Sequence, residues 1–565
     1  MTWAVKKGSE SNAHRERLDV LDTFSVVCVA IGVGLRSLWL GKRELWYDEV
    51  LSVLMASGQK SAYKLPEDVP FSLQTFSGLL AVSPMQNIAD SIESVIRGTT
   101  GDAHPPLFYL SAHVWMRLFG SSEIALRSLV LLISLATLWL GYELGRRVLG
   151  RRGGLIFTAL FSLNPFFFAH SLNLRMYAPM VFWVMVSGGC FFVLIGEGEA
   201  LEEMPATGWR RWFLRGGVAI AITAGLLTQY LFAYWLFALA ALALYLDRKR
   251  WFAHGLTLGA GVLMFVPWAL WGVRQQINNR SDVFNQISSA GGLWQSALQH
   301  GKDLAQTLAN HLLLGHLTTG MLPVEAAIKP TAVVVGLGVI GFLAVCISGL
   351  YRRRQYRVLM ISLLMGFVPL AVALMADVLA NKYTLGFGWG RSTIVALPGC
   401  LLLIAAWLTL GTGRWRSAFT AGLLSVYLLL IVGDFGWRDR QIFHQVNHEL
   451  LKTDEPTLVV MNSRAWGNVL RAVHYLEASA NADMLATDPA DVSLALTQAL
   501  NRKNYERVLW LSADYPVWGE PKTKQDAVRL IGETEALLAS RYVLKDERVL
   551  RGTMDIDRFE LKTYE

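Results

Sequence analysis

Long apolar runs alternate with short polar segments along most of the chain, and this alternation predicts membrane-spanning helices. A helix needs about 20 mostly apolar residues to cross the hydrocarbon core of a bilayer. The run Val218–Leu246 is too long for one helix and has a polar break at Thr228–Gln229–Tyr230, so it is divided into two short spans. We expect about eleven spans, near Leu21–Leu40, Leu126–Leu149, Leu155–Ala169, Met176–Ile195, two within Val218–Leu246, Leu256–Trp271, Thr331–Leu350, Val358–Ala380, Thr393–Thr409 and Ala418–Val432.

Basic residues between the runs predict the orientation, because cytoplasmic loops of membrane proteins carry an excess of lysine and arginine. The basic N-terminus, Arg146–Arg152 and Arg352–Arg354 are therefore expected inside. Residues 41–104 and 272–327 then form outer loops. The short run Pro106–Gly120 is interpreted as a membrane-edge or re-entrant helix, because a crossing there would place the arginines at 146–152 outside.

Two further features of pattern refine this division. In the first outer loop, Met85–Arg97 places Ile88, Ile92, Val95 and Ile96 on one helical face, which suits a helix lying on the membrane surface. From about Trp437 the chain changes to the composition of a soluble domain. Strands are expected at 457–461 and 507–511, and helices at 465–478, from Asp488–Pro489 to about 500, and at 524–540. We therefore predict a membrane domain, residues 1–436, and a soluble α/β domain, residues 437–565, on the outer side; the α/β domain has no Gly-rich phosphate loop and is given no catalytic role.

Composition supports the same class. The chain has 565 residues, of which 53% are hydrophobic and only 17% charged, so a soluble protein is excluded. The net charge of +8 reflects the cytoplasmic loops, and no nucleic acid partner is indicated. The four cysteines all fall in apolar runs and are expected to be small buried hydrophobes without disulfides or a metal cluster. The first apolar run lacks a small-residue cleavage site, so it is expected to remain as an anchor.

The first candidate for chemistry is Trp46–Tyr47–Asp48–Glu49, which follows the first span. One interpretation is structural: the acids cap a helix that begins near Val50, and the aromatic residues belong to an interfacial belt. The other is catalytic: Asp48, partly desolvated, has a raised pKa and removes a proton from a hydroxyl, with Glu49 in support.

Asp102 and His104 form a second candidate, next to Pro105–Pro106. The prolines are interpreted as the start of a helix, and the histidine is then incidental. Alternatively, the rigid backbone presents His104 and Asp102 beside Asp48, where the imidazole donates to a phosphate or orients a carboxylate.

Arg175 and Arg391 are expected at span ends on the outer side, where arginine is disfavoured. A lone arginine at a membrane edge is usually an anchor. Two on the disfavoured side suggest a shared anionic ligand, since a guanidinium group binds phosphate through two hydrogen bonds. Tyr230, at the broken span, is either a structural membrane-edge tyrosine or a further donor to that ligand.

These motifs recur in a fixed order: Tyr47–Asp48–Glu49, then His104–Pro105–Pro106–Leu107–Phe108–Tyr109, Phe119–Gly120 with Arg127, Arg175–Met176–Tyr177, and a late outer arginine before a span. With this set the chain resembles bacterial GT-C glycosyltransferases, the group that includes protein O-mannosyltransferases and the aminoarabinose transferase of lipid A. The resemblance covers roughly the first 410 residues.

The resemblance implies an enzyme of the bacterial cytoplasmic membrane whose donor is a polyprenyl-phosphate sugar, with inversion at the anomeric carbon at the outer face. The acceptor would be a lipid, glycan or protein. Asp48 would be the general base or an acid that positions the acceptor, and Arg175 and Arg391, with Tyr177 and Tyr230, would hold the lipid phosphate. Asn173 stands where many relatives carry an acid, and Ser392 where many carry tyrosine. No cofactor is expected, and a divalent metal is not indicated.

Two other functions are consistent with a polytopic chain. A transporter or flippase of lipid-linked sugars would carry ionisable residues in mid-bilayer, but Arg36, Glu143, Asp377 and Asp434 all lie near predicted span ends. A membrane-anchored sensor would work through the C-terminal α/β domain, for which eleven spans are an excessive anchor.

Overall fold

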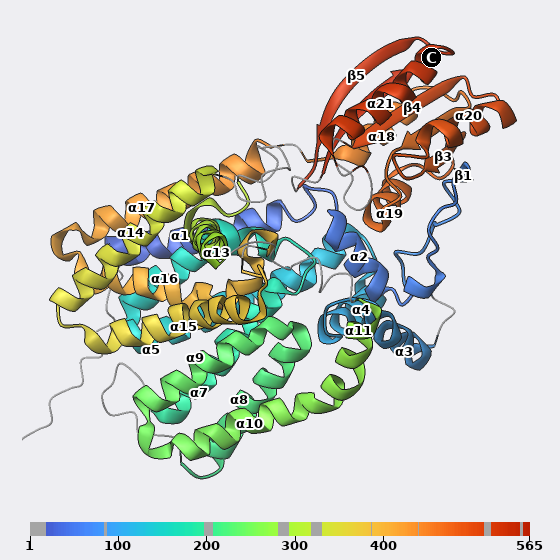
Figure 1. Ribbon diagram of the computed structural model, residues 1–565. Coiled ribbons are helices and arrows are strands. Elements are labelled where there is room, and N and C mark those ends of the chain that lie inside the picture. The colour runs from blue at the N-terminus through green and yellow to red at the C-terminus, as the bar shows by residue number, and fades with distance from the viewer. Residues whose placement is uncertain are drawn as a thin grey trace, which may run out of the picture.

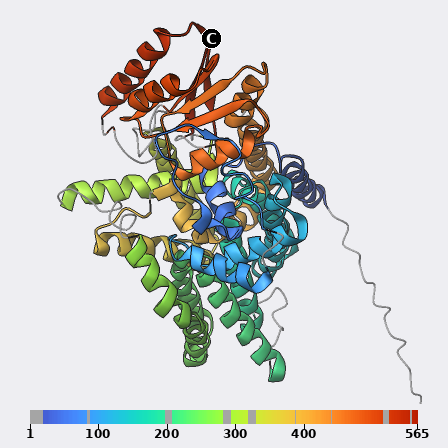
Figure 2. The same ribbon diagram turned by 90° about the vertical axis from the view of Figure 1, so that its right-hand side faces the viewer.

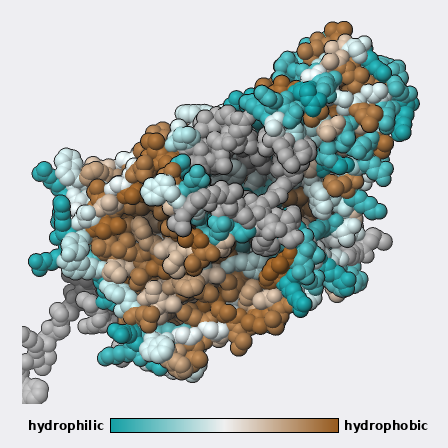
Figure 3. All heavy atoms as spheres, viewed as in Figure 1, coloured by the Kyte–Doolittle hydropathy of each residue, from teal (hydrophilic) through white to brown (hydrophobic). Residues whose placement is uncertain are grey.

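Apolar helices that are hydrophobic on most of their circumference pack into the bundle that forms most of the molecule (Figure 1). The structure is a computed structural model and describes residues 19–83, 87–196, 207–280, 293–317, 330–385, 387–438, 440–513, 521, 523–553 and 557–565. The bundle helices are α1 Val20–Leu38, α5 Glu123–Leu163, α7 Tyr177–Ile195, α8 Gly208–Thr228, α9 Ala233–Leu246, α10 Trp251–Trp268, α14 Pro330–Arg352, α15 Tyr356–Ala380, α16 Leu397–Ala406 and α17 Arg416–Ile431. Large apolar side chains such as Val334 and Leu379 point outward from them, and an apolar surface covers the bundle in Figure 3.

Every predicted span has a helical counterpart, and the expected polytopic α-helical class is confirmed. Within the described residues, eight helices are long and apolar enough to cross a membrane, and Tyr230–Leu246 is a shorter apolar helix. Two of the predicted spans lie in α5, which is interrupted at Gly150, where φ is 77°. The third predicted span ends earlier than expected: α5 stops at Leu163, and Asn164 caps the next helix. The number eleven stays a prediction.

The end of the bundle that faces the α/β domain carries most of the shorter elements. These are α2 Tyr47–Ala56, α3 Ile88–Thr99, α4 Leu107–Phe119, α6 Pro165–Ser171, α11 Arg274–Asn279 and α13 Leu293–Ala309. Short 3₁₀ or π turns complete the chain path: η1 Lys60–Ala62, η2 Tyr230–Phe232, η3 Arg248–Arg250, η4 Ala269–Val273, η5 Asn310–Leu314, η6 Phe387–Ala396, η7 Trp407–Gly411, η8 Gly413–Trp415 and η9 Val432–Gly436.

The second expected outer loop is therefore largely helical where the structure describes it, and the first contains the helices α2 and α3. The predicted surface helix is present as α3, although the first two residues of its predicted range, 85 and 86, lie outside the described residues. Its Val95 is buried against the protein, because α3 packs on α2 and α4. Helix α4 has 13 residues and would rise only about 20 Å, which is less than the thickness of the hydrocarbon core. Its length agrees with a position at the membrane edge.

The C-terminal part is an α/β domain, as expected, and its sheet has the order β1-β3-β2-β4-β6-β5 (Figures 1 and 2). Strands β2 and β4 are buried along their whole length and pair in parallel, as is typical of strands covered on both faces. Its elements are α18 Ile442–Leu450, β2 Thr457–Met461, α19 Trp466–Tyr475, β3 Ala482–Ala486, α20 Val492–Arg502, β4 Arg507–Ala513, α21 Lys524–Ala539, β5 Leu544–Arg551 and β6 Arg558–Tyr564.

One strand of this sheet comes from the other part of the chain. Strand β1, Phe71–Ser72, leaves the segment between α2 and α3 and pairs antiparallel with β3, Phe71 opposite Met484. The predicted strands and helices of the domain are present, but the expected helix start at Asp488–Pro489 is wrong, since α20 begins at Val492 after Asp491. The sheet therefore joins the first expected outer loop to the C-terminal domain.

Candidate active site

Asp48 lies at the start of α2, where one carboxylate meets two guanidinium groups. Its Oδ2 atom is 2.8 Å from the Nη1 atom of Arg391 and 3.7 Å from the Nη2 atom of Arg175. Arg391 is 343 positions and Arg175 is 127 positions from Asp48 in the chain. The Asp48 side chain keeps 19% of its surface exposed, whereas Arg175 keeps 6%. The structure thus brings three of the predicted site residues into one partly open cluster.

Glu49, the neighbouring acid, is held by the protein on all sides. Arg127 binds it through two hydrogen bonds, of 2.9 Å to Oε1 and 2.7 Å to Oε2. The backbone N–H groups of Trp46 and Leu174 donate to the same carboxylate, at 3.1 and 2.7 Å. Only 1% of its side chain is exposed. Glu49 therefore joins the start of α2 to α5 and to the turn before α7.

That turn presents Arg175 to the site. Asn164 caps α6, Pro165 occupies its first turn, and the helix ends at Ser171, so the chain reverses before α7 begins at Tyr177. The Nη1 atom of Arg175 donates to the Ser52 hydroxyl at 2.9 Å and to the carbonyl oxygen of Asp48 at 3.2 Å. Its Nη2 atom lies 3.5 Å from the Nε2 atom of His104.

Arg391 follows a left-handed turn. Gly388, Trp389 and Gly390 have φ values of 59°, 60° and 86°. A Cβ atom on Gly388 would overlap the Arg391 side chain, and one on Gly390 would lie 2.9 Å from the Thr307 methyl group. The left-handed backbone therefore favours glycine at both positions, and at Gly390 the nearby Thr307 adds a steric reason.

Helix α13 and η5 hold this turn from the outside. The Thr307 hydroxyl donates to the carbonyl oxygen of Leu385 at 3.1 Å, and the Asn310 amide donates to that of Trp389 at 3.1 Å. The Nε2 atom of His311 lies 2.8 Å from the carbonyl oxygen of Gly390. The segment 272–327, which was expected only to be an outer loop, therefore also supports the turn that carries Arg391.

Asp102 and His104 form the wall next to Arg175. The Nδ1 atom of His104 lies 3.1 Å from Oδ2 of Asp102, and the Tyr109 hydroxyl donates to the same oxygen at 2.5 Å. Because Asp102 engages Nδ1, the other ring nitrogen of His104 faces Arg175. The structure thus places His104 one contact away from the Asp48 cluster.

Tyr230 is not brought to either arginine by any contact described for the chain. Its hydroxyl donates to Oε1 of Gln276 at 2.5 Å and accepts from Nε1 of Trp268 at 2.8 Å. Gln276 in turn donates to the carbonyl oxygens of Thr99 and His104, at 2.9 and 2.8 Å. Tyr230 therefore supports the backbone of His104 through Gln276.

Two aromatic rings cover Arg391. Its guanidinium carbon lies 5.4 Å from the Tyr177 ring centroid and 5.6 Å from that of Trp46. Trp46 is fixed by its Nε1 atom, which donates to Oδ1 of Asn173 at 2.9 Å. Such stacked rings limit hydration of the guanidinium group and strengthen its attraction for an anion. Tyr177 acts on Arg391 through its ring face.

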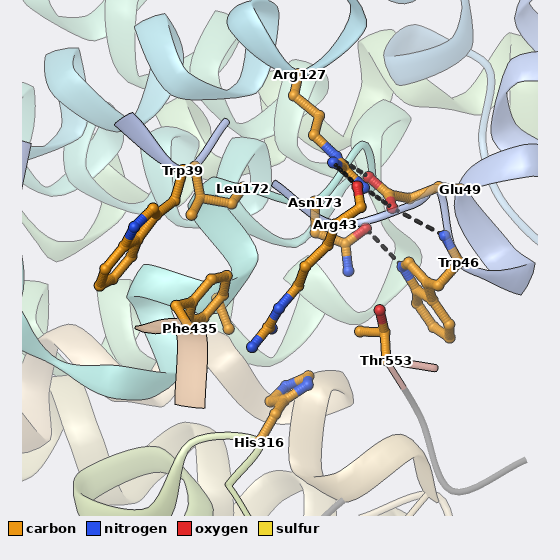
Figure 4. A pocket seen from close by; sticks show the side chains of 11 residues that line it. Trp39, Arg43, Trp46, Glu49, Arg127, Leu172, Asn173, His316, Phe435 and Thr553 are labelled. Carbon is orange, nitrogen blue, oxygen red and sulfur yellow. Dashed lines mark hydrogen bonds and ion pairs between the residues drawn. The ribbon is translucent and has the colours of Figure 1, made fainter. Parts of the chain in front are cut away.

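A hollow adjoins this aromatic wall (Figure 4). Trp46, Asn173 and Glu49 line it together with Arg43, His316 and Thr553, and Arg43 extends across it toward His316. The guanidinium carbon of Arg43 lies 3.5 Å from the Phe435 ring centroid. Trp46 and Asn173 thus belong both to the hollow and to the surroundings of Asp48.

The pKa of Asp48 differs from the expectation. Burial raises the pKa of Asp48, but the charges of Arg391, Arg175 and His104 lower it by a larger amount, so the pKa lies below its ordinary value. The predicted raised pKa is therefore wrong, because the two guanidinium groups outweigh desolvation. Burial lowers the pKa of Arg175, but Asp48, with smaller contributions from Tyr109, Tyr177 and Asp102, raises it by more, so the net shift is upward. Asp48 is an ionised carboxylate at neutral pH.

Sequence reasoning missed Ser52, Gln276 and the support from α13. Ser52 lies four residues after Asp48 on the same helix, and this spacing was a usable signal. Gln276 and Asn310 lie in segments without a pattern that points to the site. Among the residues that the structure describes, no group of three or more His, Cys, Asp or Glu side chains is arranged to hold a metal ion.

Comparison with known proteins gives one family match. Residues 103–271 match the family described as dolichyl-phosphate-mannose-protein mannosyltransferase. The matched segment contains His104, Arg127, Arg175, Tyr177 and Tyr230 and leaves out Asp48 and Arg391. It confirms the expected resemblance to the GT-C glycosyltransferase superfamily. No curated protein matches the chain by sequence.

Several solved structures are distantly similar. ArnT from Cupriavidus metallidurans, bound to undecaprenyl phosphate, is 14% identical over 96% of this chain and 98% of its own, with a TM-score of 0.40. The oligosaccharyltransferase of Archaeoglobus fulgidus is 13% identical over 87% of this chain and 69% of its own, with a TM-score of 0.44. The Pmt1–Pmt2 protein O-mannosyltransferase of S. cerevisiae, bound to its sugar donor, is 13% identical over 46% of this chain and 34% of its own, with a TM-score of 0.31.

Proposed function

We propose that this chain is a GT-C glycosyltransferase that transfers a sugar from a polyprenyl-phosphate donor to an acceptor hydroxyl, and the family match over residues 103–271 supports this proposal. The observation that carries the proposal is the position of Asp48. A single ionised carboxylate lies between two guanidinium groups at one end of an apolar bundle, and it remains partly open. A lipid-linked donor reaches such a site within the plane of the membrane.

In the proposed chemistry, the carboxylate and the two guanidinium groups have separate roles. Asp48 accepts the proton of the acceptor hydroxyl as its oxygen attacks the anomeric carbon. The bond between that carbon and the phosphate oxygen breaks, its electron pair goes to the phosphate, and the configuration inverts. Arg175 and Arg391 stabilise the charge that develops on the departing lipid phosphate, and His104 lies close enough to Arg175 to contribute.

The lowered pKa of Asp48 fits this sequence of events. In the absence of donor, both guanidinium groups make Asp48 a weak base. A donor phosphate that binds Arg175 and Arg391 competes with the carboxylate for their charge, so the pKa of Asp48 rises when the donor is bound. The base thus becomes effective when the donor is in place. Catalysis is proposed at the extracytoplasmic face of a bacterial cytoplasmic membrane, on the side of residues 437–565.

The test is a transfer assay with the protein reconstituted in liposomes. A panel of radiolabelled polyprenyl-phosphate hexoses and pentoses serves as donor, with an envelope lipid and glycan extract as acceptor. Asp48→Asn is expected to lower kcat by about 10²–10⁴-fold, because the base is lost, while the protein still inserts and elutes as the wild type. Asp90→Asn, an exposed acid on α3, is the matched control. Normal transfer by Asp48→Asn would remove Asp48 from the mechanism.

The same assay separates the enzyme from a lipid-linked sugar flippase. A flippase moves intact donor across the bilayer, whereas the enzyme moves label onto an acceptor. Ionisable groups in the bundle have local partners at helix ends: Arg36 donates to carbonyl oxygens of Gly32 and Ser162, and Asp377 accepts from the Leu385 backbone. Groups engaged in this way are poor candidates for ion coupling, and this favours the enzyme.

A further inference from the structure

The first turn of α19, in the C-terminal domain, lies directly on the first turn of α2. Ala465 packs with Trp46, Tyr47, Leu51 and Trp389 in one small apolar cluster. Tyr47 precedes Asp48, and Trp389 lies two residues before Arg391. The C-terminal domain therefore packs on the aromatic residues next to Asp48, and Trp389, near Arg391, packs on the same two rings.

Gly467 makes this approach close. A Cβ atom at this position would lie 2.5 Å from Cδ2 of Tyr47 and 2.7 Å from its Cγ atom. Such a distance is not tolerated without movement, and the atoms in the way belong to an aromatic ring that is 5% exposed. Glycine inside a helix costs about 1 kcal/mol relative to alanine. The contact with Tyr47 gives this helical glycine a packing reason.

Polar contacts hold the residues just before α2 from the same side. The hydroxyl of Tyr475, at the end of α19, accepts the backbone N–H of Leu45 at 2.7 Å and donates to Glu123 of α5. The Glu44 carboxylate accepts the backbone N–H of His444 at 2.6 Å. The chain segment that leads into Asp48, from Glu44 to Tyr47, therefore lies between the C-terminal domain and α5.

We infer that the C-terminal domain is a positioning part of the active site, and that the contact of Gly467 with Tyr47 sets the place of the Asp48 carboxylate relative to Arg391 and Arg175. This inference rests on the proposed transferase function. Gly467 is a positioning residue, since it acts through Tyr47. It follows that deletion of residues 437–565 abolishes catalysis. Because the same deletion would also abolish the function of a sensor, it does not distinguish the enzyme from a sensor.

The experiment compares three variants of the full chain in the liposome assay. Gly467→Val is expected to lower kcat by about 10²-fold with donor KM little changed, because a displacement of about 1 Å at a reacting group has an effect of this size. Gly467→Ala, with one methyl group, is expected to have a smaller effect in the same direction. Gly532→Val, on α21 of the same domain, has no atom within 4 Å of the added Cβ and is the matched control. It is expected to keep wild-type kcat.

Two readouts distinguish positioning from general destabilisation. The acid limb of the kcat/KM profile should move to higher pH in Gly467→Val, because Asp48 moves away from Arg391 and its pKa rises toward the ordinary value. Tyr47→Leu, which removes the ring that the new side chain strikes, should restore part of the activity of Gly467→Ala.

Wild-type kcat and acid limb in both Gly467 variants would overturn the inference. So would a loss of activity that Tyr47→Leu does not relieve and that leaves the acid limb in place. If Gly467→Val does not insert, the Gly467→Ala and Tyr47→Leu pair decides the question by itself. Absence of transfer by the wild-type protein would instead refute the proposed function.

Discussion

Asp48 and Glu49 are adjacent acids on the first turn of one helix, and their surroundings are opposite. Glu49 is closed: one arginine and two backbone N–H groups use its oxygens, and 1% of its side chain is exposed. Asp48 is open: it meets two arginines through a single oxygen and keeps 19% of its side chain exposed. The carboxylate of Glu49 therefore serves a structural role, whereas the carboxylate of Asp48 is available for proton transfer.

The difference arises from the helix geometry. Successive residues on a helix point about 100° apart, so Asp48 faces the turns that carry Arg175 and Arg391, while Glu49 faces Arg127 on α5. Arg127 also donates to the carbonyl oxygens of Leu40, Arg43 and Glu44. The Glu49–Arg127 pair is thus the fixed structural support of the Asp48 cluster. Substitutions on either side should separate stability from rate.

Among the substitutions of the groups that hold the two acids, the largest effect is expected from the arginines of the open cluster. Arg391→Gln and Arg175→Gln should each lower kcat by about 10²–10³-fold, because each removes charge stabilisation of the leaving phosphate. Arg391→Lys keeps the charge and loses the planar fork, so it should recover only part of the rate. Steady-state kinetics in liposomes measures this, with the exposed Arg352→Gln as control. Glutamine variants as active as the wild type would end the proposed phosphate role.

A different kind of effect is expected at the closed acid. Glu49→Gln leaves the charge of Arg127 buried without its partner, and breaking a buried pair in this way costs about 3–5 kcal/mol of stability. The rate per folded molecule should change much less than in the arginine variants. Thermal unfolding followed by size exclusion, together with kcat per folded protein, tests this. Wild-type stability combined with a collapse of kcat would reverse the roles assigned to the two acids.

The smallest effect is a shift in pH dependence. Asp48 must be ionised to act as a base, so activity should fall as the pH drops through its pKa, which the arginines hold below the ordinary value. The acid limb of kcat/KM reports this group in the free enzyme. Removal of one guanidinium in Arg391→Gln should raise the pKa and move the limb to higher pH. A limb that stays in place or moves down would show that another group is responsible.

Much of the architecture was predictable because it depends on local pattern. Apolar runs of span length predicted the bundle helices, and β-like runs predicted β2 and β4 close to their observed bounds. Strand β1 was not predictable, since two residues have no periodicity and its pairing partner β3 lies more than 400 positions away. Helix α13 was missed because polar residues interrupt its apolar positions although they are buried in the fold, among them His300, Asp303, Gln306 and Thr307. Thr307 binds the carbonyl oxygen of Leu385, before the turn that carries Arg391.

For the candidate site, the proximity of its members was more predictable than its electrostatics, and their roles stay predictions. Asp48, Arg175, Arg391 and His104 were named from their places after or before spans, and the structure brings them together. Which of the two acids is open could not be read from the pair Asp48–Glu49, because the decision lies with Arg127, 78 residues away from Glu49. The direction of the Asp48 pKa shift likewise depends on distances between residues that are far apart in sequence.

The amino-acid sequence by itself determined that this protein is a bundle of apolar helices followed by an α/β domain, since runs of 20 apolar residues and alternating strand and helix patterns are local properties. Only the tertiary structure decided that the α/β domain shares a strand with the segment between α2 and α3, and that its helix α19 lies against Tyr47. Burial, charge pairing and close packing depend on contacts between distant segments. The chemical character of Asp48 is therefore a property of the folded chain.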